Sequence, residues 1–167
     1  MNYLEEQEKL HKPTVKELNI LLADYHLYYQ KLRNFHWNIL GENFFDLHLK
    51  FEELYMDARE KIDEIAERIL TLNFHPMSKY SDYLEISNID EEKSLIDDKK
   101  MVACLIEDHG KLLEQMKKVV KEADETGDEG TIDLIGAYIR YLEKASWMLN
   151  AWSKRGKERL NSSILKE

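Results

Sequence analysis

The chain has 167 residues, which is enough for one domain with a hydrophobic core. Only six glycines and two prolines accompany 43% hydrophobic and 34% charged residues, a composition that favours long helices over a sheet with many turns. A formal net charge of −9 argues against a general nucleic-acid binder, and a single cysteine excludes an internal disulfide framework.

The first ten residues, MNYLEEQEKL, contain neither the basic segment nor the apolar segment of a signal peptide. No apolar run approaches the ~18 residues that a membrane span needs. One unpaired thiol, Cys104, is consistent with a reducing compartment. We therefore expect a soluble, cytoplasmic protein without a membrane contact.

Two long helices are predicted in the first half of the chain. Thr14 and Glu17 form a capping-box pattern, which predicts the start of the first helix. Apolar residues then recur at steps of three and four to about Leu40. Gly41 is expected to end this helix, and Asn43 or a neighbour to cap a second helix that reaches about residue 72.

The pattern weakens around Pro76, where a short helix is expected over residues 78–84. Asn88 and Glu91 predict the cap of a third long helix that ends near residue 125. A turn at 126–128 then leads into a fourth helix.

Loop lengths decide the predicted topology. Short turns make the first and second helices antiparallel, and likewise the third and fourth. The middle connection of about 15 residues is long enough to return along a whole helix. The sequence therefore predicts an all-α, ferritin-like four-helix bundle with one long crossover that contains a short helix, as a single domain over residues 1–167.

Four polar residues of the second helix lie on one stripe of its surface. His48 and Glu52 are four residues apart, and so are Asp63 and Glu67, which places the four at roughly 0°, 40°, 60° and 100° around the axis. Along the axis, His48 and Asp63 are about 22 Å apart, too far for one metal ion. An antiparallel copy of this helix, crossing near Asp57, would bring each His–Glu pair beside the partner's Asp–Glu pair. Spacing alone thus predicts two equivalent metal sites at a two-fold interface.

His36, near the end of the first helix, is a fifth candidate ligand. A lone histidine on an apolar face is more often a hydrogen-bonded core residue, and Asp63 with Glu67 alone would suit a solvated face. Imidazole and carboxylate together, without thiolate, suit iron, manganese or zinc. A two-iron centre inside one bundle is not expected, because the single Glu-x-x-His motif, Glu8 to His11, has no counterpart.

Two segments resemble the signatures of the Dps family of miniferritins. The first is HWNILG at 36–41, followed by Leu47-His48 and Glu52, and the second is IDEIAER at 62–68, followed by Leu72-Asn73 and Pro76. A late segment, LEKASWML at 142–149, also fits, so the resemblance spans nearly the whole chain.

The resemblance implies a hollow homododecamer that stores iron oxide and protects against oxidative damage. Such proteins oxidise Fe(II), preferably with hydrogen peroxide, at two-iron centres shared between subunits. The implied catalytic and metal-binding residues are His36, His48 and Glu52 of one subunit and Asp63 and Glu67 of its partner. Glu52 stands where many relatives have Asp. Trp37 is placed near the centre, where it either relays electrons and radicals or simply packs.

Two further expectations concern the surface. Asp124, Glu129 and Asp133 are predicted, by rough alignment with the family, to ring a three-fold iron pore, although acids near a helix N-terminus also stabilise the helix. DNA coating is the alternative function. The first 13 residues hold three acids and two lysines, which argues against an N-terminal DNA arm. The basic cluster at 154–159 suits either DNA or the end of the last helix.

Overall fold

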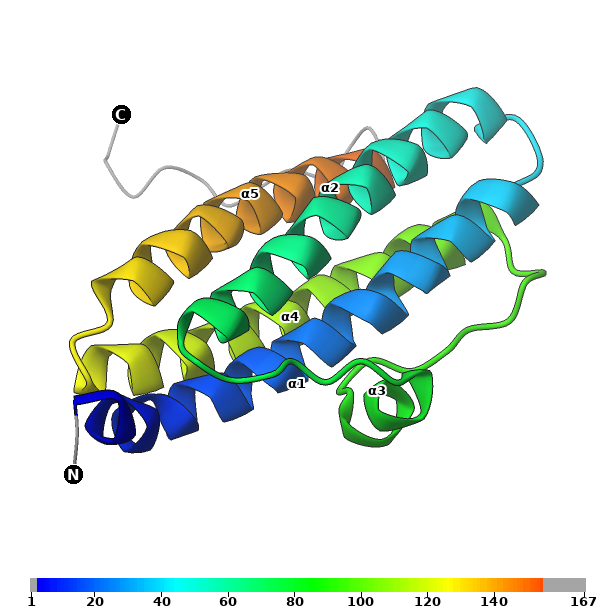
Figure 1. The fold of residues 1–167 in the computed structure, drawn as a ribbon. Helices are drawn as coiled ribbons and strands as arrows, with labels where there is room; N and C mark the ends of the chain where they lie inside the picture. Colours follow the sequence, from blue (N-terminus) through cyan, green and yellow to red (C-terminus); the bar gives the residue numbers. More distant parts are fainter. Residues whose placement is uncertain (1–2, 155–167) are drawn as a thin grey trace, which may run out of the picture.

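The structure, a computed structural model, describes residues 3–154 (Figure 1). In this part of the chain there are helices and no strands: α1 (Tyr3–Asn38), α2 (Phe44–Thr71), α3 (Tyr80–Ile86), α4 (Asp98–Glu125) and α5 (Glu129–Ser153). Figure 1 shows α1, α2, α4 and α5 side by side in a bundle, with α3 in the long crossover, and α3 packs on α1. The all-α bundle with a helix-containing crossover is therefore confirmed. None of the described helices is both long and apolar enough to cross a membrane.

The bundle core is built from one apolar face of each long helix. On α1, side chains from Leu18 to Phe35 at helical spacing are almost completely buried. On α2, the buried apolar residues are Leu47, Phe51, Leu54, Ala58, Ile65 and Ile69. Because these residues occupy one side of α2, the opposite side is left to solvent or to another subunit.

α1 begins earlier than the capping-box pattern predicted. The helix runs from Tyr3 straight through Pro13, so Thr14 lies in its interior. Thr14 is fully buried, and its hydroxyl has no hydrogen-bond partner among the described residues, so it is not a cap. The early segment is held from outside, since the Asn73 amide donates to Glu8 Oε1 at 2.7 Å. Pro13 removes one helical hydrogen bond, and this contact ties the turn before it to the end of α2.

α4 begins later than predicted, at Asp98. The backbone N–H and the side-chain amide of Asn88 instead donate to the completely buried carboxylate of Asp24, at 2.6 and 3.1 Å. A buried carboxylate needs such donors, and this need holds Asn88 in the crossover. The true N-cap is Asp97, which accepts from the Lys100 backbone N–H at 2.9 Å.

Both short turns use glycine at a positive φ, where other residues are strained. Gly41 has φ 104° between α1 and α2, and Gly127 has φ 67° in the predicted turn between α4 and α5. In the second turn Asp128 accepts from the Thr131 backbone N–H at 3.1 Å and from Arg68 at 2.6 Å. This network fixes the start of α5 against the end of α2.

Candidate metal centre

His36 of α1 and His48 of α2 form a stacked pair. Their ring centroids are 3.7 Å apart, with an interplanar angle of 17°. The Nδ1 of each ring lies 2.7 Å from the main-chain oxygen of the other histidine. Because a carbonyl oxygen only accepts, each Nδ1 must carry the hydrogen and donate it. In the neutral rings Nε2 then keeps its lone pair, which is the tautomer that a metal ligand requires.

Two aromatic side chains hold the histidine pair. Phe44 stacks on His48, with centroids 4.9 Å apart, and Tyr55 lies edge-on to His36 at 5.2 Å. His36 is only 8% exposed. Contacts within the subunit therefore hold the pair in place.

Glu52 lies one helical turn beyond His48 and contacts Tyr55. The Tyr55 hydroxyl donates to Glu52 Oε1 over a long distance of 3.4 Å. Sequence reasoning missed Tyr55, and the available signal was its spacing of three residues from Glu52, which places the two side by side on a helix.

Asp63 and Glu67 lie farther along α2, and both are exposed. Since α2 is one continuous helix, the separation of about 22 Å between His48 and Asp63 holds in the folded chain. Within residues 3–154, no three His, Cys, Asp or Glu side chains gather closely enough to hold a metal ion. A single subunit thus presents two separate halves of the candidate centre.

The candidate ligands of α2 share their stripe with exposed apolar side chains. At about 100° per residue, this stripe covers the sector of roughly 0–100° measured from His48. The apolar members are Phe45 (76% exposed), Leu49 (61%), Met56 (43%) and Leu70 (50%). An exposed apolar surface of this length indicates a protein–protein contact.

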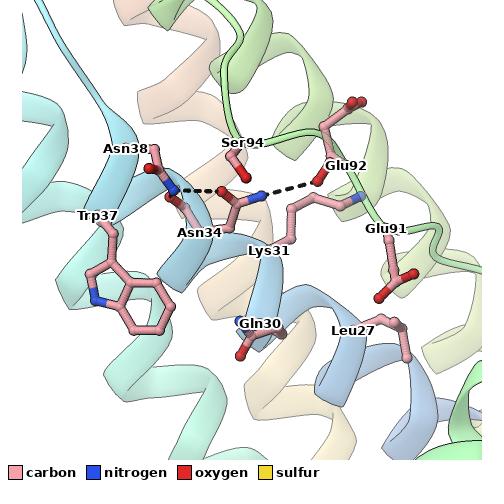
Figure 2. A pocket seen from close by; sticks show the side chains of 9 residues that line it. All are labelled: Leu27, Gln30, Lys31, Asn34, Trp37, Asn38, Glu91, Glu92 and Ser94. Atoms are coloured by element: carbon pink, nitrogen blue, oxygen red, sulfur yellow. Dashed lines mark hydrogen bonds between the residues drawn. The ribbon is translucent and has the colours of Figure 1, made fainter.

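Trp37 lies outside the core of the subunit. Its ring is 58% exposed, and the Arg33 guanidinium carbon lies 4.8 Å from the ring centroid, a cation–π distance. Figure 2 shows Trp37 at a cavity of about 260 Å³, which Asn34 and Glu92 also line. The Asn34 amide donates to the Glu92 main-chain oxygen at 3.0 Å and closes one side. Of the candidate site residues, Trp37 alone lines this cavity.

The predicted pore acids lie around the turn between α4 and α5, and all three side chains are exposed. Asp124 is near the end of α4, Glu129 is the first residue of α5, and Asp133 lines a hollow between α2 and α5. Lys154 is exposed, and the rest of the basic cluster at 154–159 lies outside the described residues.

Comparison with known proteins supports the fold and identifies the family. The sequence matches the family profile described as a ferritin-like domain over residues 15–158. The chain is 41% identical over 143 residues to DNA protection during starvation protein 2 of Bacillus anthracis, which covers 86% of this chain and 98% of that protein. It is 39% identical over 143 residues to the DNA protection during starvation protein of Porphyromonas gingivalis, with 86% and 90% covered.

Solved structures give the same result. The crystal structure of the Dps protein from Vibrio cholerae O1, described as a member of a broad superfamily of ferritin-like diiron-carboxylate proteins, matches with a TM-score of 0.86 and 46% identity over 88% of this chain and 92% of that chain. The Dps protein from Bacillus brevis matches with a TM-score of 0.85 and 38% identity, over 87% and 98%. The protein is therefore a ferritin-like four-helix protein. Within that class it belongs to the Dps family.

Proposed function

We propose that this protein is a ferroxidase and iron-storage protein. It oxidises Fe(II) at two-iron centres shared between subunits, and it stores the ferric product inside a hollow homododecamer. The observation that carries this proposal is the stacked histidine pair at one end of an exposed stripe on α2, with Asp63 and Glu67 at the other end. Family membership supports it, because the Vibrio cholerae relative is described as a diiron-carboxylate protein.

The exposed stripe of α2 is arranged to pair with an antiparallel copy of itself. The midpoint between His48 and Glu67 falls between residues 57 and 58, and so does the midpoint between Glu52 and Asp63. Two of the apolar residues share this centre, since Phe45 is as far from it as Leu70. A two-fold axis there therefore sets imidazole beside carboxylate and apolar side chain beside apolar side chain. Two complete sites form at once, one on each side of the axis.

The donor set suits oxidation of Fe(II). The carboxylates of Glu52, Asp63 and Glu67 stabilise Fe(III) more than Fe(II), which lowers the reduction potential and favours loss of an electron. His36 and His48 add neutral nitrogen donors through Nε2. Two adjacent Fe(II) ions give one electron each to hydrogen peroxide, which takes up two protons and becomes two waters. No hydroxyl radical is released, because peroxide receives both electrons at one site.

Iron reaches the interior, in this proposal, through an acidic pore formed by Asp124, Glu129 and Asp133 of three subunits. Rings of carboxylates concentrate cations in a narrow opening. Asp133→Asn is expected to slow iron uptake and leave assembly intact. Uptake at the parent rate would remove Asp133 from the pore.

Anaerobic Fe(II) titration followed by peroxide tests the shared centre. Asp63→Asn and His36→Ala should each abolish fast oxidation while the mass of the assembly in solution is unchanged. Co-assembly of the two variants should restore part of the activity, because some interfaces then combine an intact half from each chain. Asp46→Asn, which removes an exposed acid of α2 about 160° around the helix from His48, is the matched control. No recovery in the mixed assembly would contradict shared centres.

DNA coating is the second function, and the names of the relatives favour it. The net charge of −9 opposes it. A gel-shift experiment at low salt separates the two functions, since a retarded species is expected only if the protein binds DNA.

A further inference from the structure

Three tyrosines form a continuous series from the wall of a cavity, where Tyr138 is only 4% exposed, into the bundle core. Tyr138 of α5 lines a cavity of about 340 Å³ between α2 and α5 that is also lined by Glu60 and Asp133. Its ring lies edge-on to Tyr25 of α1, with centroids 6.4 Å apart. Tyr25 in turn lies edge-on to Tyr28 at 6.2 Å. These are contact distances for aromatic rings.

The inner end of the series is hydrogen-bonded to a neutral histidine. The Ser146 hydroxyl donates to the Leu142 main-chain oxygen at 2.7 Å, so its oxygen accepts from His109 Nδ1–H, also at 2.7 Å. His109 Nε2 is then the acceptor for the Tyr28 hydroxyl, again at 2.7 Å. Burial lowers the pKa of His109 to about 3, so the ring is uncharged at neutral pH and its Nε2 has a lone pair.

The middle member, Tyr25, is unusual because its hydroxyl is not satisfied. The side chain is completely buried, and the hydroxyl has no hydrogen-bond partner among the described residues. An unpaired buried hydroxyl is unfavourable, and phenylalanine would fill the same space without that cost. The property that tyrosine has and phenylalanine lacks is ready one-electron oxidation of the ring.

We propose that Tyr138, Tyr25 and Tyr28 form an electron relay. The relay transfers a one-electron oxidation from the cavity between α2 and α5 to a protected site at Tyr28. The oxidant is a hydroxyl radical or another one-electron oxidant that arises at the acid-lined surface. Tyr138 gives up the first electron, and electrons from Tyr25 and then Tyr28 replace it. The oxidant gains one electron and one solvent proton and becomes water, while Tyr28 loses one electron and passes its phenolic proton to His109 Nε2. The products are water, a neutral Tyr28 radical and a His109 cation.

The radical is most stable on Tyr28, because this side chain has a hydrogen-bonded proton acceptor and is buried. An oxidised phenol is a strong acid, so it is stabilised where a base takes its proton, and Tyr25 has no such base. Tyr28 is 1% exposed, which keeps solvent and other radicals away from it. Tyr138 also donates to an acceptor, Glu64, but it lies at the wall of the open cavity. A radical on Tyr28 therefore outlives one on Tyr138.

Freeze-quench electron paramagnetic resonance on the assembled, iron-free protein tests the relay. The probe is sulfate radical produced by light from persulfate, so the outcome is independent of the ferroxidase experiments. The parent protein should give a long-lived tyrosyl radical with an exchangeable proton coupling from the hydrogen bond to His109. Tyr28→Phe should remove this signal.

Tyr25→Phe is the decisive variant, because it deletes a hydroxyl without a partner and should not disturb folding. It should leave a short-lived Tyr138 radical and abolish the long-lived one. Tyr83→Phe is the matched control, since Tyr83 is also buried but donates to the Met77 main-chain oxygen and not to a base. The proposal is overturned if Tyr25→Phe keeps the long-lived signal, if Tyr83→Phe loses it as well, or if the parent protein gives none.

Discussion

Lys31 of α1 and Asp108 of α4 form an ion pair inside the bundle. The ammonium nitrogen and the carboxylate oxygen are 2.7 Å apart, and the two side chains are 4% and 3% exposed. Burial raises the pKa of Asp108, and the hydrogen bond from Lys31 opposes this rise. The pair joins two helices that are far apart in the sequence.

Asp108→Ala is expected to destabilise the protein by about 3–5 kcal/mol, because it leaves the buried ammonium of Lys31 without a partner. The double replacement Lys31→Met with Asp108→Leu should recover most of this loss, since it removes both charges and keeps apolar volume. Urea unfolding of both variants measures the difference. A double variant as unstable as the single one would show that the pair is not the cause.

His109 should make stability depend on pH. Its pKa is about 3 in the folded chain, against an ordinary value of 6.5. Below pH 6.5 the unfolded chain therefore binds a proton that the folded chain does not, so stability is complete above that pH and falls as the solution becomes more acidic. Between pH 7 and pH 5 the expected loss is about 2 kcal/mol. Unfolding curves of the parent and of His109→Gln, recorded at both pH values, measure this loss. The parent should lose about 2 kcal/mol more than the variant between pH 7 and pH 5. Equal losses in the two proteins would refute the prediction.

Asp128 should contribute more to the stability of the fold than Asp97, the other aspartate that caps a long helix. Burial alone would raise the pKa of Asp128, but hydrogen bonds from Thr131 and the nearby Arg68 outweigh it and lower the pKa. Asp128→Ala removes the α5 cap and the contact with Arg68, an expected loss of about 2–4 kcal/mol. Asp97→Ala, at the exposed cap of α4, is the matched control and should lose much less. Thermal unfolding compares them, and equal effects would contradict the role of Arg68.

Asp24 should hold the crossover in place. Its carboxylate accepts from Asn88 and from the Ser87 hydroxyl, the latter at 2.9 Å. Asp24→Asn replaces one carboxylate oxygen with an NH2 group, which would face the donor groups of Ser87 and Asn88. Hydrogen exchange at residues 87–97 should therefore speed up, while the core of α4 stays protected. Asp90→Asn, an exposed acid in the same segment, is the control. Unchanged exchange in Asp24→Asn would show that the segment is held by other contacts.

Features that depend on local pattern were predictable from the sequence. The bounds of α2 follow from apolar spacing and flanking turn residues, and the stripe of His48, Glu52, Asp63 and Glu67 follows from helical period alone. Thr14 and Asn88 show the limit of such reasoning. Each lies in a sequence pattern typical of a helix N-cap, but neither residue caps a helix. Contacts between residues far apart in the sequence extend α1 and hold the crossover instead. These contacts join Asn73 to Glu8 and Asn88 to Asp24.

The histidine pair shows a second limit. Residues 36 and 48 lie on different helices, so no period relates them, and their reciprocal hydrogen bonds depend on the shape of the intervening turn. The contact of Tyr55 with both His36 and Glu52 has the same origin. Which residues are candidates was readable from the sequence, whereas how they are held was not. The assignment of these residues as ligands stays a prediction.

The reciprocal bonds between His36 and His48 have a kinetic consequence. Flipping either ring would break a hydrogen bond and unstack the pair, so the two imidazoles resist rotation even while the protein is empty. In the proposed centre their Nε2 atoms would be oriented in advance, so ion capture would need no conformational search by these two side chains. If the proposed centre and shell form, slow steps in iron loading should therefore lie in transport through the shell or in release of water by the ion.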